Sequence, residues 1–245
     1  LVSPRWPTRQ LLSALDPHAP DLVVEVRSGI KLDQQGLELA NVGVVSLYTA
    51  GLKPGAAEIA RLLRKMRTIT GSAPTMDALA ALDAPFVLSP EWTRRHTDAI
   101  FLNNALAATI LSRQRGLFSR IVHPSLNAGP QMPWAQSPFV VCHLAEDNLE
   151  NHGFLLSVVE LEARRRGLNL RRGSSFGFRE HRFETIIPKL REGRGLFKIA
   201  MGATSGPSRD GIVSLFVELA SYENFAALRA AYPDVQAVDL TDLEP

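Results

Sequence analysis

The sequence predicts an α/β fold in its first part, followed by one long helix and a smaller α+β layer. Three observations support this prediction. Short β-rich segments alternate with segments of helical periodicity, one helical stretch covers residues 90–115, and several short apolar runs follow it. We expect a first domain at residues 1–115, including this linking helix, and a second domain at residues 116–245.

Composition limits the classes of function. The 245 residues are 45% apolar and 21% charged, which is typical of a globular protein with a core. The net charge of +2 is too near neutral to indicate a nucleic-acid or membrane partner, and we expect neither. Cys142, the single cysteine, lies in the apolar run FVVCHLA, so we expect a buried thiol, no disulfide framework and a cytoplasmic location. No apolar run reaches the ~18 residues of a membrane span.

The first part contains the segments that place the chemistry. We expect strands where β-rich runs are bounded by glycines and turns, and helices where apolar residues recur every three or four positions. The expected strands are residues 21–28 and 43–49, and the expected helices are 8–15, 56–67, 75–82 and 90–115.

The second part alternates in the same way. A helix is expected at residues 147–166, with Asp147 or Asn148 as its cap and Gly167 as its stop. A last helix is expected at 212–228. The expected strands are residues 118–123, 139–144, 168–171, 175–178 and 196–200.

One short stretch suggests chemistry directly. In LVVEVRSGIKL, residues 22–32, a strand leads into Ser28, Gly29 and, two residues later, Lys31. The glycine permits a sharp turn, the serine can donate to a phosphate, and a lysine at the end of a buried strand can form a Schiff base. Such a lysine is more often simply solvated, so the motif alone is weak.

This stretch resembles the cofactor-lysine segment of fold-type-I pyridoxal-phosphate (PLP) enzymes, and the chain is most similar to their cysteine/methionine-metabolism (cystathionine synthase/lyase-like) group. The resemblance implies that Lys31 is the catalytic lysine that holds pyridoxal 5'-phosphate and that Ser28 is a phosphate ligand. The group usually has threonine where this chain has Ile30. The implied fold is the end of the PLP-binding large domain, a long linking helix and a small α+β C-terminal domain.

Four further segments support the resemblance. RRHTDAIFLNNALA and VHPSL are similar to segments of the group's linking helix and of the strand after it, although Arg95 and His96 fit the solvated side of that helix better. GSSFGFREHR resembles the segment that lines the substrate carboxylate, with Ser175 in the serine position. GLFKIAMG places Lys198 where the group has a carboxylate-binding arginine, so nearby Arg182 is a second candidate for the anion.

Other sequence patterns give weaker indications of function. Ser175 also suits an ordinary edge strand, and Arg182, like Arg179 in the same stretch, also suits surface charge. The basic run at residues 164–166 suits a solvated helix end, and the six histidines show no metal spacing, so we expect no metal. GATSGPS, residues 202–208, lacks the lysine and the helix of a nucleotide-binding loop.

The resemblance implies an enzyme that acts on an amino acid through a Lys31 Schiff base, with elimination or replacement at a side-chain carbon preferred. An aminotransferase is the alternative, and a catalytically silent structural subunit is the second. Roughly half of the resembled enzymes precedes this lysine, so we expect a C-terminal half of a processed, split or partial chain. Upstream residues or a companion chain would supply the N-terminal half, in a homo- or heterodimer.

Overall fold

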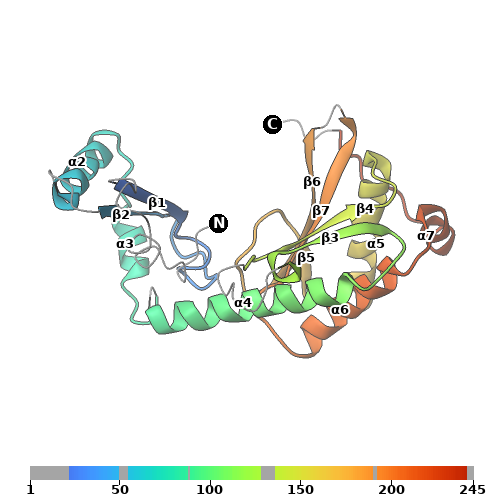
Figure 1. The fold of residues 1–245 in the computed structure, drawn as a ribbon. Coiled ribbons are helices and arrows are strands. Elements are labelled where there is room, and N and C mark those ends of the chain that lie inside the picture. The colour runs from blue at the N-terminus through green and yellow to red at the C-terminus, as the bar shows by residue number, and fades with distance from the viewer. Residues whose placement is uncertain (1–21, 50–54, 88, 128–135, 190–191, 242–245) are drawn as a thin grey trace. The chain divides into compact units, whose positions relative to one another are not determined.

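The structure is a computed structural model that describes residues 22–49, 55–87, 89–127, 136–189 and 192–241 (Figure 1). The chain divides into two compact units, Leu1–Thr97 and Asp98–Pro245, here called unit 1 and unit 2. The division falls inside helix α4 (Pro90–Leu111). The domain boundary expected after residue 115 stays a prediction.

Unit 1 contains a two-stranded antiparallel ribbon. Strand β1 (Leu22–Ser28) pairs with β2 (Gly43–Thr49), which confirms both predicted strands. The predicted helices are also present as α2 (Ala56–Ile69) and α3 (Met76–Leu82), followed by the first two turns of α4. The helix expected at 8–15 lies outside the described residues.

The prediction that β1 is a buried strand is wrong. Within it only Glu25 is buried, whereas Val24 is 48% and Val26 is 67% exposed. Because side chains alternate along a strand, these valines share one face with Val45 of β2, which is 54% exposed. One face of the ribbon is therefore apolar and open, and the opposite face carries Glu25.

Unit 2 is a five-stranded sheet with helices packed against it (Figure 1). The strand order is β3-β4-β7-β6-β5, and every pair is antiparallel except β5–β6. The strands are β3 (Phe118–Val122), β4 (Val140–Leu144), β5 (Leu170–Arg172), β6 (His181–Lys189) and β7 (Arg194–Ala200). The helices after α4 are the short η1 (Pro124–Leu126), then α5 (Leu149–Arg165), α6 (Pro207–Ala220) and α7 (Phe225–Ala231).

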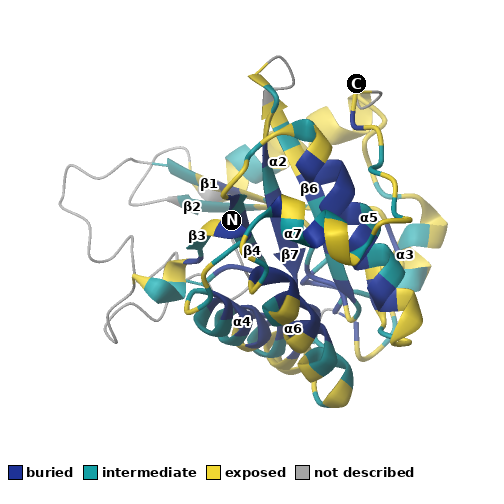
Figure 2. Cartoon of the chain, turned by 90° about the vertical axis from the view of Figure 1, so that its right-hand side faces the viewer, coloured by how far each residue is buried: buried dark blue, intermediate teal, exposed yellow. Residues whose placement is uncertain are grey.

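The core of unit 2 is built around Phe197 on the central strand β7. Its ring centroid lies 6.3 Å from that of Phe118, 6.1 Å from Phe183 and 6.0 Å from Phe216. Figure 2 shows the buried faces of α5 and of the strands turned toward one another. Asn104 of α4 bonds to the end of β7 through both the N–H and the C=O of Met201 (3.0 and 2.8 Å). The small α+β layer expected after the long helix is present.

Several predicted boundaries are wrong in unit 2. Residues 175–178 form no strand, with bends beginning at residue 177, and the long strand β6 was not predicted. The helix expected at 212–228 is two helices, because the Asn224 side chain accepts from the Ala227 N–H and starts α7. Helix α4 ends at Leu111 instead of residue 115. GATSGPS does lead into a helix, since Pro207 begins α6.

Candidate functional site

Lys31 lies on the tight turn that follows β1, where its side chain is half-buried. The turn begins at Gly29, whose N–H donates to Val42 O at 2.8 Å, and it closes where the Gly36 N–H donates to Lys31 O at 2.8 Å. A Cβ at Gly29 would lie 2.9 Å from Val42 Cγ2. The glycine expected to allow a sharp turn is therefore required here by close backbone packing.

Side chains of the turn itself hold its shape. The buried amide of Gln34 spans the loop, with Nε2 donating to Ala40 O at 2.7 Å and Oε1 accepting from Ala40 N at 3.0 Å. Gln35 has a positive φ of 55° and donates to Phe86 O at 2.6 Å. A non-glycine residue in this conformation is strained, so these bonds fix a turn that would not form from local preference alone.

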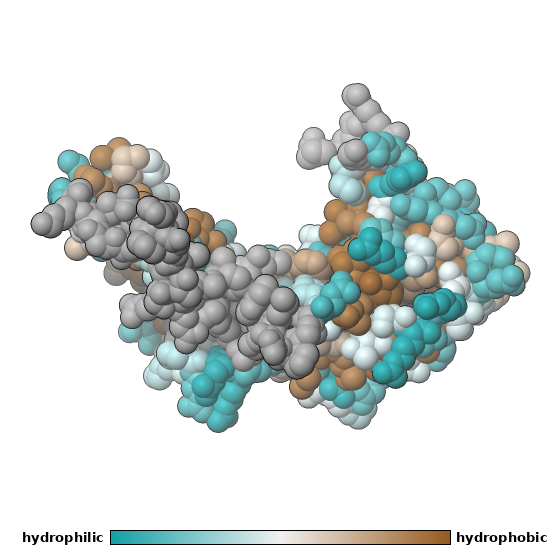
Figure 3. Space-filling view, viewed as in Figure 1, coloured by the Kyte–Doolittle hydropathy of each residue, from teal (hydrophilic) through white to brown (hydrophobic). Residues whose placement is uncertain are grey.

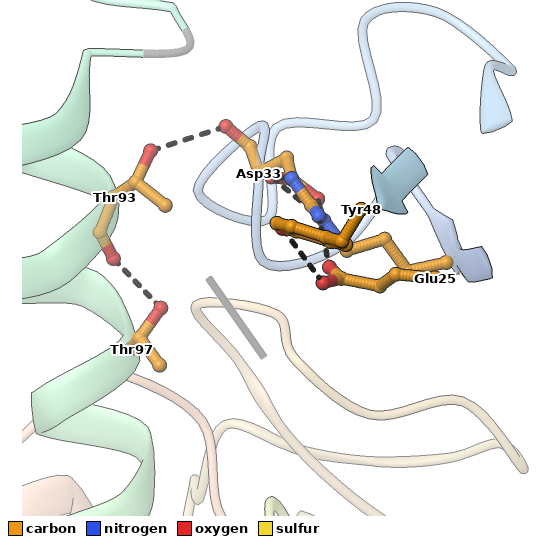
Figure 4. Close-up of polar contacts among 6 residues, drawn as sticks. Glu25, Asp33, Tyr48, Thr93 and Thr97 are labelled. Carbon is orange, nitrogen blue, oxygen red and sulfur yellow. Dashed lines mark hydrogen bonds and ion pairs between the residues drawn. The ribbon is translucent and has the colours of Figure 1, made fainter. Parts of the chain in front are cut away.

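A charged cluster lies directly beside this turn (Figure 4). Arg27 of β1 grips Asp33 with two bonds, Nε to Oδ2 at 3.0 Å and Nη2 to Oδ1 at 3.1 Å, and also donates to Glu25. The bonds to Asp33, more than those to Glu25, raise the pKa of Arg27. Tyr48 of β2 donates to Glu25 Oε2 at 3.2 Å, and Thr93 of α4 donates to Asp33 O at 3.3 Å. The cluster therefore joins β1, β2, the Lys31 turn and α4.

The donors beside Lys31 match PLP in part. The Lys31 amine and the exposed Ser28 hydroxyl fit the cofactor's aldehyde and phosphate in chemical type. Ile30 offers no hydroxyl, and the N–H groups of Gly29 and Gly36 already bond to backbone carbonyls. Arg27 is held by two carboxylates and so does not offer its charge to a phosphate.

The other predicted site residues lie in unit 2. Lys198 is buried on β7 with its Nζ donating to Ser174 O and lying 5.8 Å from the Phe139 ring centroid. Arg182 of β6 donates to Glu180 Oε1 at 3.0 Å. Because Glu184 pairs with Lys198 in register, Arg182 and Lys198 share one face of the sheet.

Ser175 is half-buried in the segment between β5 and β6, close in sequence to the Ser174 carbonyl that binds Lys198. Arg182 also stacks on the Phe178 ring, with its guanidinium carbon 3.7 Å from the centroid. Lys198 and Arg182, the two predicted anion binders, therefore have local partners that a substrate carboxylate would have to displace or share.

The Glu25–Arg27–Asp33 cluster was missed in the sequence. Its signal was present, because two charged residues alternate with valines in LVVEVRS and so must share one face of the strand. The expectation of a solvated Arg95 is confirmed by its exposed pair with Glu91 at 2.6 Å. The same expectation for His96 is wrong, since that side chain is buried.

The structure confirms the expectation for Cys142. Cys142 is buried on β4, and this burial raises the pKa of its thiol, as expected for a core residue. Among the described residues, no group of His, Cys, Asp and Glu side chains could hold a metal ion. Within that same part of the chain, no helix combines the length and apolar character needed to cross a membrane.

No protein-family model and no curated protein matches this sequence. Solved structures do match. One is an apo methionine gamma lyase from Micromonospora echinospora, at 17% identity and a TM-score of 0.53, covering 80% of this chain and 48% of that one. Another is a cystathionine gamma synthase from Xanthomonas oryzae pv. oryzae in complex with cystathionine, at 14% identity and a TM-score of 0.53, covering 82% and 51%.

These matches confirm, at the level of the fold, the resemblance to the cysteine/methionine-metabolism group of fold-type-I enzymes. The chain is a mixed α/β structure that spans about half the length of the solved chains it matches. At identities this low, the matches show a shared fold. The role of each side chain has to be argued from the geometry around it.

Proposed function

We propose that this chain is the lysine-bearing part of a PLP-dependent enzyme that acts on an amino acid, with Lys31 as the residue that forms the Schiff base. The observation that carries the proposal is the half-buried Lys31 amine on a braced turn after β1. The fold supports it, because the chain resembles part of a methionine gamma lyase and of a cystathionine gamma synthase.

Each residue of the turn has a role in this proposal. Lys31 Nζ would hold the cofactor through its aldehyde and, once the substrate is bound, would act as the general base toward the proton on the substrate α-carbon. The protonated amine would then act as the general acid toward the departing group. The Ser28 hydroxyl donates to the phosphate. The cofactor, when bound, withdraws electrons from the substrate carbon.

Two of the proposed substrate contacts, Lys198 and Arg182, lie on one sheet face of unit 2, and Ser175 lies in the segment between β5 and β6. Lys198 would attract the substrate carboxylate as a point charge, with Arg182 and the Ser175 hydroxyl as further donors. Figure 3 shows hydrophobic surface over the strands of this unit, where the half-buried Val141 and Leu196 share a face with Lys198. This apolar surface would contact the substrate side chain. Elimination or replacement at a side-chain carbon is the preferred reaction, with transamination as the alternative.

A partner half is part of the proposal. Helix α2 turns an apolar stripe to solvent, and Figure 3 shows hydrophobic surface over this helix. The stripe consists of Leu62, Leu63, Met66 and Ile69, each 42–72% exposed. Together with the open valine face of the ribbon, it suits burial against the N-terminal half of the same enzyme, supplied by upstream residues or a companion chain in a homo- or heterodimer.

The second candidate is a catalytically silent structural subunit. Ile30 in place of a hydroxyl-bearing residue favours it, as do the existing partners of Lys198 and Arg182. In that case the chain would support an active partner without taking up the cofactor itself.

Borohydride reduction in the presence of pyridoxal 5'-phosphate, followed by peptide mass spectrometry, tests the proposal. We expect the reduced adduct on Lys31, its loss in Lys31→Ala, and wild-type labelling in Lys65→Ala, a matched change on exposed α2. Equal labelling of Lys31 and Lys65 would refute the proposal. If the chain takes up no cofactor even when co-expressed with the polypeptide encoded directly upstream, the silent subunit is favoured.

A further inference from the structure

The interior of unit 1 is mostly polar. Among its described residues, only Leu32, Ala40 and Val87 are buried apolar side chains. Its buried polar side chains outnumber them and comprise Glu25, Asp33, Gln34, Gln35, Thr93, His96 and Thr97. Several of these bond to the Lys31 turn or are part of it, so polar contacts rather than apolar packing set the shape of this turn.

Arg27 occupies the centre of these contacts. Its guanidinium binds both oxygens of Asp33 in the two-pronged geometry that fixes direction as well as distance, and it binds Glu25 on its own strand. Asp33 lies two residues after Lys31. Arg27 therefore ties the far side of the turn back to the strand that precedes Lys31.

Such a cluster contributes orientation more than stability. Removing buried charges from water costs free energy that their attraction only partly returns, and apolar side chains of similar volume often give a more stable protein. A two-pronged ion pair next to a strained turn instead selects one conformation of that turn. The positive φ of Gln35, two residues after Asp33, shows that the selected conformation is one that local preference disfavours.

We propose that Arg27 is a positioning residue of the Lys31 site. By clamping Asp33 to Glu25 it presents the Lys31 amine from a fixed turn, without contacting cofactor or substrate itself. The inference rests on the proposed role of Lys31. Fixing a nucleophile within reach of its target speeds bond formation without changing how tightly the target is captured.

The test follows Schiff-base formation between the full chain and pyridoxal 5'-phosphate by absorbance, for wild type, Arg27→Gln and Arg27→Lys. In Arg27→Gln we expect the first-order rate at saturation to fall about tenfold or more, with the half-saturating concentration within about twofold of wild type. Arg27→Lys keeps the charge and loses the two-pronged contact, so it should restore the rate only in part. Arg61→Gln, an exposed arginine of α2, is the matched control and should behave as wild type.

Hydrogen exchange without any cofactor gives a second measurement. The Gly36 N–H bonds to Lys31 O and closes the turn, so its exchange should become faster in Arg27→Gln and stay unchanged in Arg61→Gln. If Arg27→Gln does not fold, Asp33→Asn removes the partner's charge with little change in volume and takes its place in both measurements.

The outcomes separate the inference from the proposed function. Wild-type rate and wild-type Gly36 exchange in Arg27→Gln would overturn the positioning role. A raised half-saturating concentration at an unchanged rate would also overturn it, because Arg27 would then bind the phosphate directly. A wild-type chain that forms no Schiff base even when co-expressed with the polypeptide encoded directly upstream would instead refute the proposed role of Lys31, and the inference would fall with it.

Discussion

The interior of unit 2 is an apolar core in which the rings of Phe183, Phe197 and Phe216 meet. The interior of unit 1 beside the Lys31 turn is instead held together by ion pairs among Glu25, Arg27 and Asp33. The surfaces differ as well. Among the described residues, Leu102 and Ile186 are the large apolar side chains exposed on unit 2, and the remaining exposed ones belong to unit 1.

The two interiors differ in what they contribute to the protein. Unit 2 encloses a large apolar core, and burial of apolar surface is the main force that stabilises a fold. A two-stranded ribbon with an open valine face is marginal in water. The interior of unit 1 consists mostly of polar contacts that orient one turn. We therefore expect contacts with other parts of the assembled protein, rather than its own packing, to keep unit 1 folded.

The core of unit 2 gives the largest expected effect. Phe197→Ala removes the ring that touches three others and should lower the free energy of unfolding by ~3–5 kcal/mol, measured by urea denaturation. Phe86→Ala in unit 1, where the ring is 49% exposed, is the control and should change it by less than ~0.5 kcal/mol. Equal losses would contradict the comparison between the units.

A buried histidine gives unit 2 a pH-dependent stability. Burial, with a smaller effect of Arg209, lowers the pKa of His181 to about 4, and its Nδ1 accepts from the Gly202 N–H at 3.1 Å. Because the folded pKa lies below the unfolded one, this stability is complete above the unfolded pKa of about 6.5 and is lost as the pH falls toward 4.

Between pH 7 and pH 4 we expect a loss on the order of 3 kcal/mol from His181, and a smaller loss in His181→Asn, both measured by urea denaturation. The same pH dependence in both proteins would show that His181 is not the group that titrates.

The open face of the ribbon should matter for assembly and little for the chain alone. Val26→Thr keeps the branched shape and removes apolar surface at a 67% exposed position, so the free energy of unfolding should change by less than ~0.5 kcal/mol. Binding to a co-expressed N-terminal half, measured by size-exclusion chromatography, should weaken. Full binding with Val26→Asp would show that this face is not the interface.

The smallest effect is expected on the outside of α4. Arg95→Ala breaks an ion pair with Glu91 in which both side chains are more than half exposed. Such pairs contribute little, so the thermal midpoint should stay close to wild type and the free energy of unfolding should fall by less than ~0.5 kcal/mol. A larger loss would indicate that Arg95 does more than pair with Glu91.

Much of the fold could be predicted because the signals were local. A short β-rich run bounded by glycines marked β2, helical periodicity marked α2, and a cap residue marked the start of α5, where Asn148 accepts from the Asn151 N–H at 2.9 Å. Strand β6 was missed because HRFETIIPK mixes charged residues and a proline with its apolar positions. The break between α6 and α7 was missed because the apolar pattern continues across it, although Asn224 is a typical cap.

The candidate site divides in the same way. The turn at Gly29 and the position of Lys31 on it were expected from the residues themselves, since a glycine before a lysine is a local signal. That Arg27 faces Asp33, and that Lys198 contacts Ser174 O, depends on how strands and loops return to one another, and the sequence gives no distance between them.

By itself the sequence determined the elements whose hydrogen bonds and side-chain periods are short-range: the ribbon strands, the long helix and the turn that carries Lys31. The tertiary structure alone decided which charges meet and which apolar faces stay open. Glu25 is buried while its neighbours Val24 and Val26 are exposed, the reverse of their transfer preferences, because burial depends on what packs against a face and not on the residues within it.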